Sequence, residues 1–192
     1  MFIFLGLLVL VVLYIVGFYN GLKTTEVRIG ASIQEIGNQL KRQAELIPNL
    51  VDSVKGYLTH EKGIFTQLTD ARKLVTTALE TQDPKAIDKA QASLTQALRS
   101  ITVIAESNPE IKASNLVSNL MGELRDTSDK VMYARRTLID LTADFNVKIS
   151  TIPGIWFASM FGFKAKPGLE TPTSGDFLTV NPKDTAPPQV KL

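Results

Sequence analysis

The feature that most constrains this chain is an apolar run near its N-terminus. Residues 2–19 read FIFLGLLVLVVLYIVGFY, with no charged residue, no amide and no proline. At about 1.5 Å of helical rise per residue, a run of this length spans roughly 27 Å, close to the hydrocarbon thickness of a bilayer. The run therefore predicts a transmembrane anchor over residues 1–19, and every charged side chain lies outside it.

The flanks of this run favour a retained anchor over a secretory signal. A signal carries positive residues before a shorter apolar core and small residues at its cleavage site. Here only Met1 precedes the run, which ends in Gly17-Phe18-Tyr19-Asn20. A cleaved or pilin-like signal is the alternative. Lys23 and Arg28 follow the run closely, so the positive-inside rule predicts a single-pass protein with its remaining chain in the cytoplasm.

Beyond the anchor, apolar residues recur with the period of a long helix. From Ile29 to Leu58 they are spaced by three or four residues, close to the 3.5-residue repeat of helices packed at shallow angles. No strong turn signal separates this stripe from the apolar run, so the two are predicted to form one rod. Pro48 lacks the N–H that would bond to residue 44 and is expected to kink or restart the rod.

Capping signals divide the sequence that follows into further helices. The first stripe stops at residue 81, and Asp83-Pro84 and Asn108-Pro109 each place a capping side chain before a proline. A last long helix carries apolar residues from Leu116 to Ile149. No alternating strand pattern flanked by hairpin turns is present. The predicted fold is all-α, with the transmembrane helix continuous with a long antiparallel four-helix bundle over residues 20–163.

Residues 164–192 differ in composition from the bundle. They hold five of the nine prolines together with glycine, threonine and mixed charge. Such a segment cannot bury enough apolar surface to offset the entropy of ordering it. A disordered tail is therefore predicted over residues 164–192.

A set of sequence blocks extends over residues 1–165, the most specific being LIPNLV at 46–51 followed by VKGY and HE. The blocks are Tyr19-Asn20, Gln39-Leu40-Lys41-Arg42, Leu46-Ile47-Pro48-Asn49-Leu50-Val51, Val54-Lys55-Gly56-Tyr57, His60-Glu61, Ala71-Arg72, Asn108-Pro109-Glu110-Ile111-Lys112-Ala113, Ala134-Arg135, Phe145-Asn146, Ile152-Pro153 and Phe161-Gly162-Phe163. Together they resemble the LemA family of bacterial membrane-anchored helical proteins. The resemblance implies a single-span protein of the bacterial inner membrane with a helical bundle and no established catalytic activity. A branch of that family is associated with membrane invagination in magnetosome-forming bacteria, which implies a membrane-shaping role.

The composition argues against an enzyme. There is no cysteine and one histidine, His60, which excludes thiolate metal sites, cysteine nucleophiles and histidine-rich metal sites. His60-Glu61 lacks the second histidine of a zinc protease motif, and neither a phosphate-binding glycine loop nor a nucleophile elbow occurs. A net charge of +2 does not describe a nucleic-acid binder with a basic face. We expect no catalytic residue, cofactor, metal or nucleic-acid partner.

Charged residues on the apolar stripes are predicted to form ion pairs between helices. Continuing the first stripe past residue 58 places Glu61 and Arg72 on the core side, and Arg135 lies on the stripe of the last helix. Glu61 and Arg72 are roughly 16 Å apart along one helix and cannot meet each other. Because a buried charge needs a partner, Glu61 and Glu123 are the candidate acids and Arg72 and Arg135 the candidate bases.

Residues 153–163 form an aromatic-rich segment with three interpretations. The favoured one is a lid that closes the open end of the bundle. The others are an interfacial wedge or protein-binding patch, and packing on a neighbouring subunit. The candidate interface residues are Trp156, Phe157, Phe161 and Phe163.

These features predict a structural protein rather than a catalyst. The leading hypothesis is a membrane-anchored scaffold that self-assembles and organises or remodels the bacterial membrane, with the lipid bilayer and further copies of the chain as partners. The alternative is a membrane-tethered docking module that recruits an unidentified soluble protein through its bundle or its proline-rich tail.

Overall fold

The computed structural model describes residues 1–57 and 62–169. These residues form helices and connecting segments with no strand among them, which confirms the predicted all-α class. The elements are α1 (Phe2–Val54), the short 3₁₀ helix η1 (Lys55–Tyr57), α2 (Lys62–Thr81), α3 (Pro84–Ser107), α4 (Pro109–Lys112), α5 (Asn115–Ser150) and α6 (Gly154–Met160).

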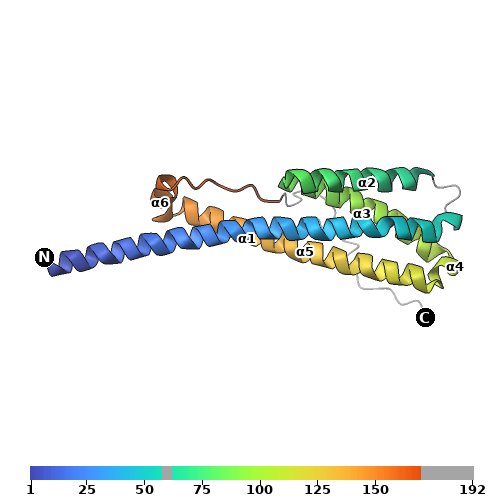
Figure 1. The fold of residues 1–192 in the computed structure, drawn as a ribbon, viewed down its shortest axis with the longest axis horizontal. Coiled ribbons are helices and arrows are strands. Elements are labelled where there is room, and N and C mark those ends of the chain that lie inside the picture. The colour runs from blue at the N-terminus through green and yellow to red at the C-terminus, as the bar shows by residue number, and fades with distance from the viewer. Residues whose placement is uncertain (58–61, 170–192) are drawn as a thin grey trace, which may run out of the picture.

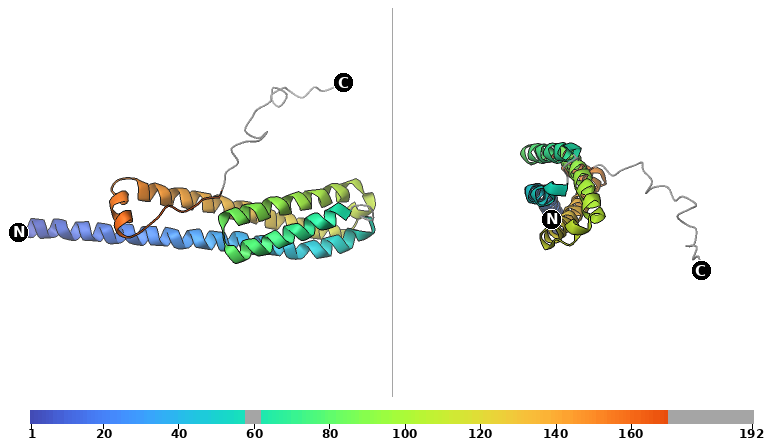
Figure 2. Two further views of the ribbon diagram at one scale, coloured as in Figure 1. Left: turned by 90° about the horizontal axis from the view of Figure 1, so that it is seen from above. Right: turned by 90° about the vertical axis from the view of Figure 1, so that its right-hand side faces the viewer.

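Four long helices, α1, α2, α3 and α5, run roughly parallel to the long axis of the molecule, and α2 and α3 lie beside only the part of α1 that is farthest from the N-terminus (Figures 1 and 2). α1 packs chiefly against α5 and α2 against α3, and α1 also contacts both α2 and α3. The chain reverses direction between successive long helices. The N-terminal part of α1 projects beyond all the other helices, and α6 lies beside α1 close to where this projection begins.

The apolar run and the first stripe belong to a single helix, as predicted. α1 contains 53 residues and includes Pro48 in its interior, so the expected restart at the proline does not occur. A helix of this length extends for roughly 80 Å. Its apolar N-terminal window has no side chain buried by the rest of the molecule, whereas from Leu22 onward one face is buried against the other helices.

The core consists of apolar side chains at helical spacing on facing sides of the four long helices. On α1, Ile29, Ile36, Leu40 and Ile47 are almost completely buried, whereas the predicted stripe residue Ile33 is half-buried. The largest fully buried side chains are Phe145, Leu22, Ile36, Leu40, Ile47, Leu50, Ile87, Leu94, Ile101, Ile111 and Leu138. Leu116, expected in the core, is 60% exposed because its neighbour Val117 turns inward instead.

The predicted register of α2 is wrong by one residue over much of its length. The core positions are Ile64, Leu68, Ala71, Val75 and Ala78, so Ala71 is buried where Arg72 was predicted. The stripe cannot be carried across this region because α1 ends at Val54 and α2 begins at Lys62. Arg72, predicted on the core side, is exposed. His60 and Glu61 lie outside the described residues.

Capping side chains mark the starts of α3, α4 and α5, and the last of these caps was missed by the sequence prediction. Asp83 and Asn108 accept the backbone N–H groups of Lys85 and Glu110, as their positions before proline predict. The helix that starts at Pro109 ends after four residues, however. Ser114 then accepts the N–H of Val117 at 3.4 Å and caps the start of α5. The last helix therefore begins at Asn115 rather than at Pro109.

The boundary predicted for the C-terminal tail is too early. The side-chain amide of Asn146 donates to the carbonyl oxygen of Lys166 and accepts its N–H, both at 2.9 Å. Leu169 is buried in the core. Residues 164–169 are therefore ordered against the helices, because the amide of Asn146 satisfies their backbone and Leu169 buries apolar surface. The rest of the predicted tail, 170–192, lies outside the described residues.

Candidate membrane interface

The chain turns back at the end of α5 so that α6 lies against both α5 and α1. α5 ends where the N–H of Thr151 bonds to the carbonyl oxygen of Val147 at 3.0 Å. Gly154, the first residue of α6, is buried at this contact. A Cβ atom on Gly154 would lie 1.9 Å from the carbonyl oxygen of Lys148 and 2.8 Å from the Phe18 ring. Only glycine allows this close approach.

Phe157 joins α6 to the last turns of the apolar run. Its ring centroid lies 6.2 Å from that of Tyr14 and 6.1 Å from that of Phe18, at tilted angles. Tyr14 and Phe18 are themselves stacked at 6.3 Å. Aromatic rings in this geometry attract one another beyond the surface that they bury. α6 is therefore held against the apolar run itself.

A second group of rings continues the contact toward the bundle. Tyr19 lies 5.1 Å from Phe161 and 5.7 Å from Phe163, measured between ring centroids. Phe163 meets the fully buried Phe145 of α5 edge-on at 6.1 Å. These rings connect the end of the apolar run in α1, the segment after α6 and the core of the bundle. Residues 153–163 thus pack on α1 and α5, and their closing of the bundle end stays a prediction.

The opposite side of this segment exposes apolar side chains to the surroundings. Trp156 and Met160 are each 64% exposed, and Phe161 is 41% exposed although one edge touches Tyr19. The exposed apolar side chains here, called the α6 patch below, are Ile152, Ile155, Trp156, Met160 and Phe161. Of the four interface candidates, Phe157 and Phe163 therefore pack inward and Trp156 and Phe161 belong to the patch.

A charged cluster follows the aromatic rings by two turns of α1. Glu26 accepts a hydrogen bond from Lys166 on one carboxylate oxygen and from Lys23 at 2.7 Å on the other. The hydrogen bond from Lys166, and then that from Lys23, lowers the pKa of Glu26. The same contact with Glu26 raises the pKa of Lys23. This cluster fixes the returning segment to α1.

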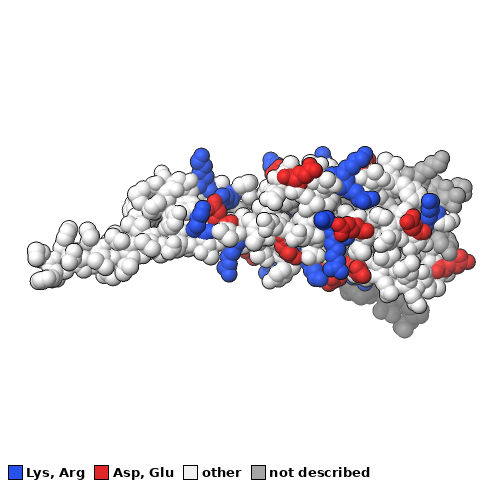
Figure 3. Space-filling view, in the orientation of Figure 1, with Lys and Arg blue, Asp and Glu red and all other residues white. Residues whose placement is uncertain are grey.

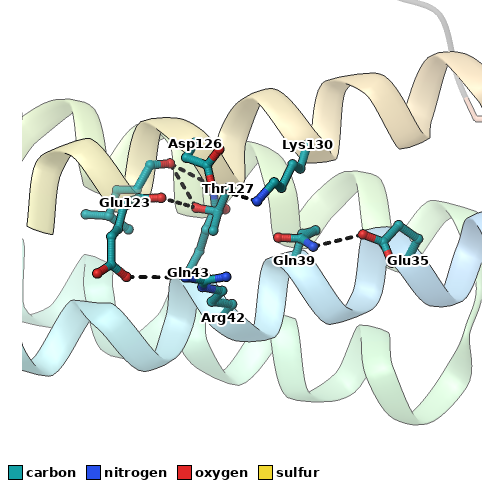
Figure 4. Close-up of polar contacts among 9 residues, drawn as sticks. Glu35, Gln39, Arg42, Gln43, Glu123, Asp126, Thr127 and Lys130 are labelled. Carbon is teal, nitrogen blue, oxygen red and sulfur yellow. Dashed lines mark hydrogen bonds and ion pairs between the residues drawn. The ribbon is translucent and has the colours of Figure 1, made fainter.

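Glu123 and Arg135 each form an ion pair with a residue of another helix, as predicted, but their partners differ from the predicted ones. Arg42 of α1 lies 3.6 Å from Glu123 of α5, and both side chains are about half-exposed (Figure 4). Arg135 is largely buried between α5 and α3, where it contacts Asp88 and donates to Gln91 at 2.7 Å. The predicted partners are therefore wrong for Glu123 and Arg135.

The structure also contains a buried polar contact that was not predicted. Gln43 of α1 is 4% exposed and donates to Ser128 at 2.7 Å and to the carbonyl oxygen of Leu124 at 3.4 Å. Thr127 is fully buried and bonds to the carbonyl oxygens of its own helix, as Figure 4 shows. The sequence did contain a signal for this contact, because Gln43 lies seven residues from both Ile36 and Leu50 and therefore shares their face of the helix.

Within residues 1–57 and 62–169, no group of three or more His, Asp or Glu side chains is arranged to hold a metal ion. One helix, α1, is long and apolar enough to cross a membrane. The molecule is thus of a class in which a bundle helix extends into an apolar projection, with an aromatic contact at its base.

The LemA family model matches residues 32–183, so the chain belongs to the LemA family. No curated protein matches the sequence.

Proposed function

We propose that the chain is a membrane-anchored structural protein without catalytic activity. In this proposal the apolar part of α1 crosses the bacterial inner membrane, and copies assemble side by side to organise or remodel it. The observation that carries the proposal is the continuity of α1 from Phe2 to Val54. A flexible linker would uncouple the bundle from the spanning segment, whereas an uninterrupted helix fixes the direction of the bundle relative to that segment.

The packing of the apolar run supports its retention as an anchor. Tyr14, Phe18 and Tyr19 all contact rings of the segment that follows α5. Cleavage after this run would remove those rings and expose the inner side of Phe157. The last turns of the run are therefore part of the folded structure, which is not expected of a signal peptide.

The surface supports a lipid partner over a nucleic acid. Figure 3 shows basic and acidic side chains interspersed over the bundle on the face in view, whereas the projecting part of α1 carries none. A nucleic-acid interface would collect basic side chains along one face. The apolar projection instead matches the interior of a bilayer.

The proposal places the bundle in the cytoplasm because Lys23 and Arg28 follow the anchor. The chain contains no cysteine, so a single cysteine at the exposed Tyr133 reports the side of the membrane. In intact cells, Tyr133→Cys should resist a membrane-impermeant maleimide and react only after the membrane is opened. Reaction in cells whose inner membrane is intact would place the bundle outside.

Electron microscopy of the purified full-length chain tests the assembly directly. The comparison is a variant lacking residues 2–12, which keeps Tyr14, Phe18 and Tyr19 and so preserves the α6 contact. The intact mass of the full-length sample verifies that the anchor is retained. We expect regular rings, arrays or reshaped liposomes with the full-length chain alone.

Single copies in both samples, on liposomes of unchanged shape, would contradict the scaffold. That result would favour the alternative function, in which the anchored bundle docks a soluble protein.

A further inference from the structure

The α6 patch lies at a defined level along the apolar helix. Phe157 contacts Tyr14 and Phe18, and Phe161 contacts Tyr19. Residues 14–19 are the last of the apolar run and cover about 8 Å of helical rise. When residues 2–19 cross a bilayer, α6 is consequently carried to the boundary between the acyl chains and the headgroups.

Exposed apolar side chains concentrate at this level. Beyond residue 19, eleven large apolar side chains are exposed among the described residues, and five of them lie between 152 and 161. Monomeric soluble proteins rarely gather such side chains in one place without covering them. Ile152 and Trp156 are 73% and 64% exposed while Ala158, on the inner side of α6, is buried. α6 therefore has two apolar sides, of which the protein covers one.

Three lysines near the patch direct their ammonium groups to its bundle side. Lys148, whose carbonyl oxygen adjoins Gly154, directs its ammonium to Asp144 at 2.7 Å, one turn farther from α6. Lys23 and Lys166 meet at Glu26, beyond the aromatic rings. The polar layer thus begins where the apolar run and the patch both end.

We propose that the α6 patch inserts into the acyl–headgroup boundary of the bilayer that α1 crosses, as a second membrane contact beside the anchor. The proposal rests on the proposed function, because it requires α1 to be inserted. Continuity favours lipid as the occupant, since Phe161 of the patch contacts Tyr19, the exposed last residue of the apolar run. Tryptophan is the residue best suited to such a boundary.

A second contact beside the helix axis has a mechanical consequence. A single helix that crosses a bilayer can still tilt and change its depth. Contact at α6 opposes tilts that would lift the patch out of the boundary, because α6 is packed on both α1 and α5 and moves with the bundle. The direction of each bundle relative to the membrane is then held within a narrower range, which favours lateral assembly.

Trp156 is the only tryptophan, so its fluorescence in the full-length chain reports the patch directly. The protein is reconstituted in phosphatidylcholine vesicles whose acyl chains carry bromine, a contact quencher, either near the headgroup or near the bilayer centre. We expect Trp156 emission to shift to shorter wavelength than in water. It should lose more intensity to the shallow bromine than to the deep one, and iodide in the buffer should quench it little.

Two relocated tryptophans provide matched controls in a Trp156→Phe background. Leu10→Trp lies within the apolar run and should be quenched most by deep bromine. Tyr133→Trp is at an exposed site of α5, about 22 Å of helix away from Lys148, and should be quenched by iodide alone.

The outcomes separate this inference from the proposed function. Lipid quenching of Leu10→Trp together with quenching of Trp156 by iodide alone would overturn the α6 contact and leave the anchor intact. Protection of Trp156 from both quenchers would also overturn it and indicate that another protein surface covers the patch. Absence of lipid quenching at Leu10→Trp would contradict the proposed function itself.

Discussion

Arg135 is a charged side chain that the bundle accommodates between two helices. Its guanidinium contacts Asp88 and Gln91 of α3, and the Arg135 and Asp88 side chains are only 17% and 22% exposed. Arg135→Met leaves the partly buried side chains of Asp88 and Gln91 without their contacts to the guanidinium. It should therefore lower the free energy of unfolding by about 1–3 kcal/mol. Denaturant unfolding of the full-length chain in detergent measures the change. The control Arg136→Met alters an exposed neighbour and should change stability by less than about 0.5 kcal/mol.

Glu26 should make the stability of the chain sensitive to acid. Its pKa lies below the ordinary value of 4.5, because Lys166 and Lys23 hydrogen bond to the carboxylate. The folded chain then binds this proton less tightly than the unfolded chain does. The stabilisation is therefore present above the unfolded pKa and is lost as the pH falls through the folded pKa. Melting temperatures at about pH 7 and pH 3 should differ more for the natural chain than for Glu26→Gln.

The control for this experiment is Glu45→Gln. Glu45 is 65% exposed and lies 3.9 Å from Lys41, a surface pair of little expected value. An acid response of Glu26→Gln equal to that of the natural chain would contradict the assignment of the acid response to Glu26.

For single residues, the sequence predicted which face of a helix a side chain occupies better than it predicted the residue with which that side chain pairs. Spacing placed Arg135 on an inner face, because the 3.6-residue period is a local property of the helix. Its partner Asp88 lies 47 residues away, and the axial offset between α3 and α5 that brings them together is not encoded in either stripe. Arg72 was misplaced for a related reason, since α1 ends at Val54 and α2, which starts at Lys62, is a separate helix with its own register.

Among the helices, α6 is held by one close contact that can be tested. Gly154→Ala would place a Cβ atom against the Lys148 carbonyl oxygen and the Phe18 ring. This overpacking should destabilise the docking of α6 by about 1–3 kcal/mol. Hydrogen exchange over residues 154–163 should accelerate while that of α3 stays unchanged. Equal exchange in both chains would mean that α6 does not depend on this contact.

Gly122→Ala is the matched control, since nothing lies within 4 Å of a Cβ atom there. In the interior of α5 it should raise stability by about 0.5–1 kcal/mol through helix propensity.

Element boundaries were predicted where a side chain sets them locally. Asp83-Pro84 marked the start of α3, and the unbroken apolar spacing marked the continuity of α1. The cap at Ser114 was missed because Asn108-Pro109 already signals the start of a helix. The structure shows that this helix, α4, ends after four residues, so that Ser114 can cap the next one. The docking of α6 was not predictable in detail, since it depends on aromatic contacts between residues more than 130 positions apart.

In the whole molecule, the proposed function requires α1 to connect the bilayer rigidly to the bundle. A helix that passes through the boundary without a hinge keeps residues on either side at a fixed separation. Leu8 and Glu35 are both exposed and 27 residues apart, which corresponds to about 40 Å along a continuous helix. Because the chain has no cysteine, spin labels can be attached specifically to Leu8→Cys with Glu35→Cys.

The most direct measurement is the distribution of distances between these two labels, by pulsed electron resonance on the full-length chain in lipid nanodiscs. A second pair with the same spacing inside α5, Leu116→Cys with Ala143→Cys, gives the width expected of an uninterrupted helix. A continuous rigid α1 should give a single peak near 40 Å that is as narrow as that of the α5 pair. A broad distribution, or a peak at shorter distance, would reveal a hinge at the membrane boundary and show that α1 does not connect the bilayer rigidly to the bundle.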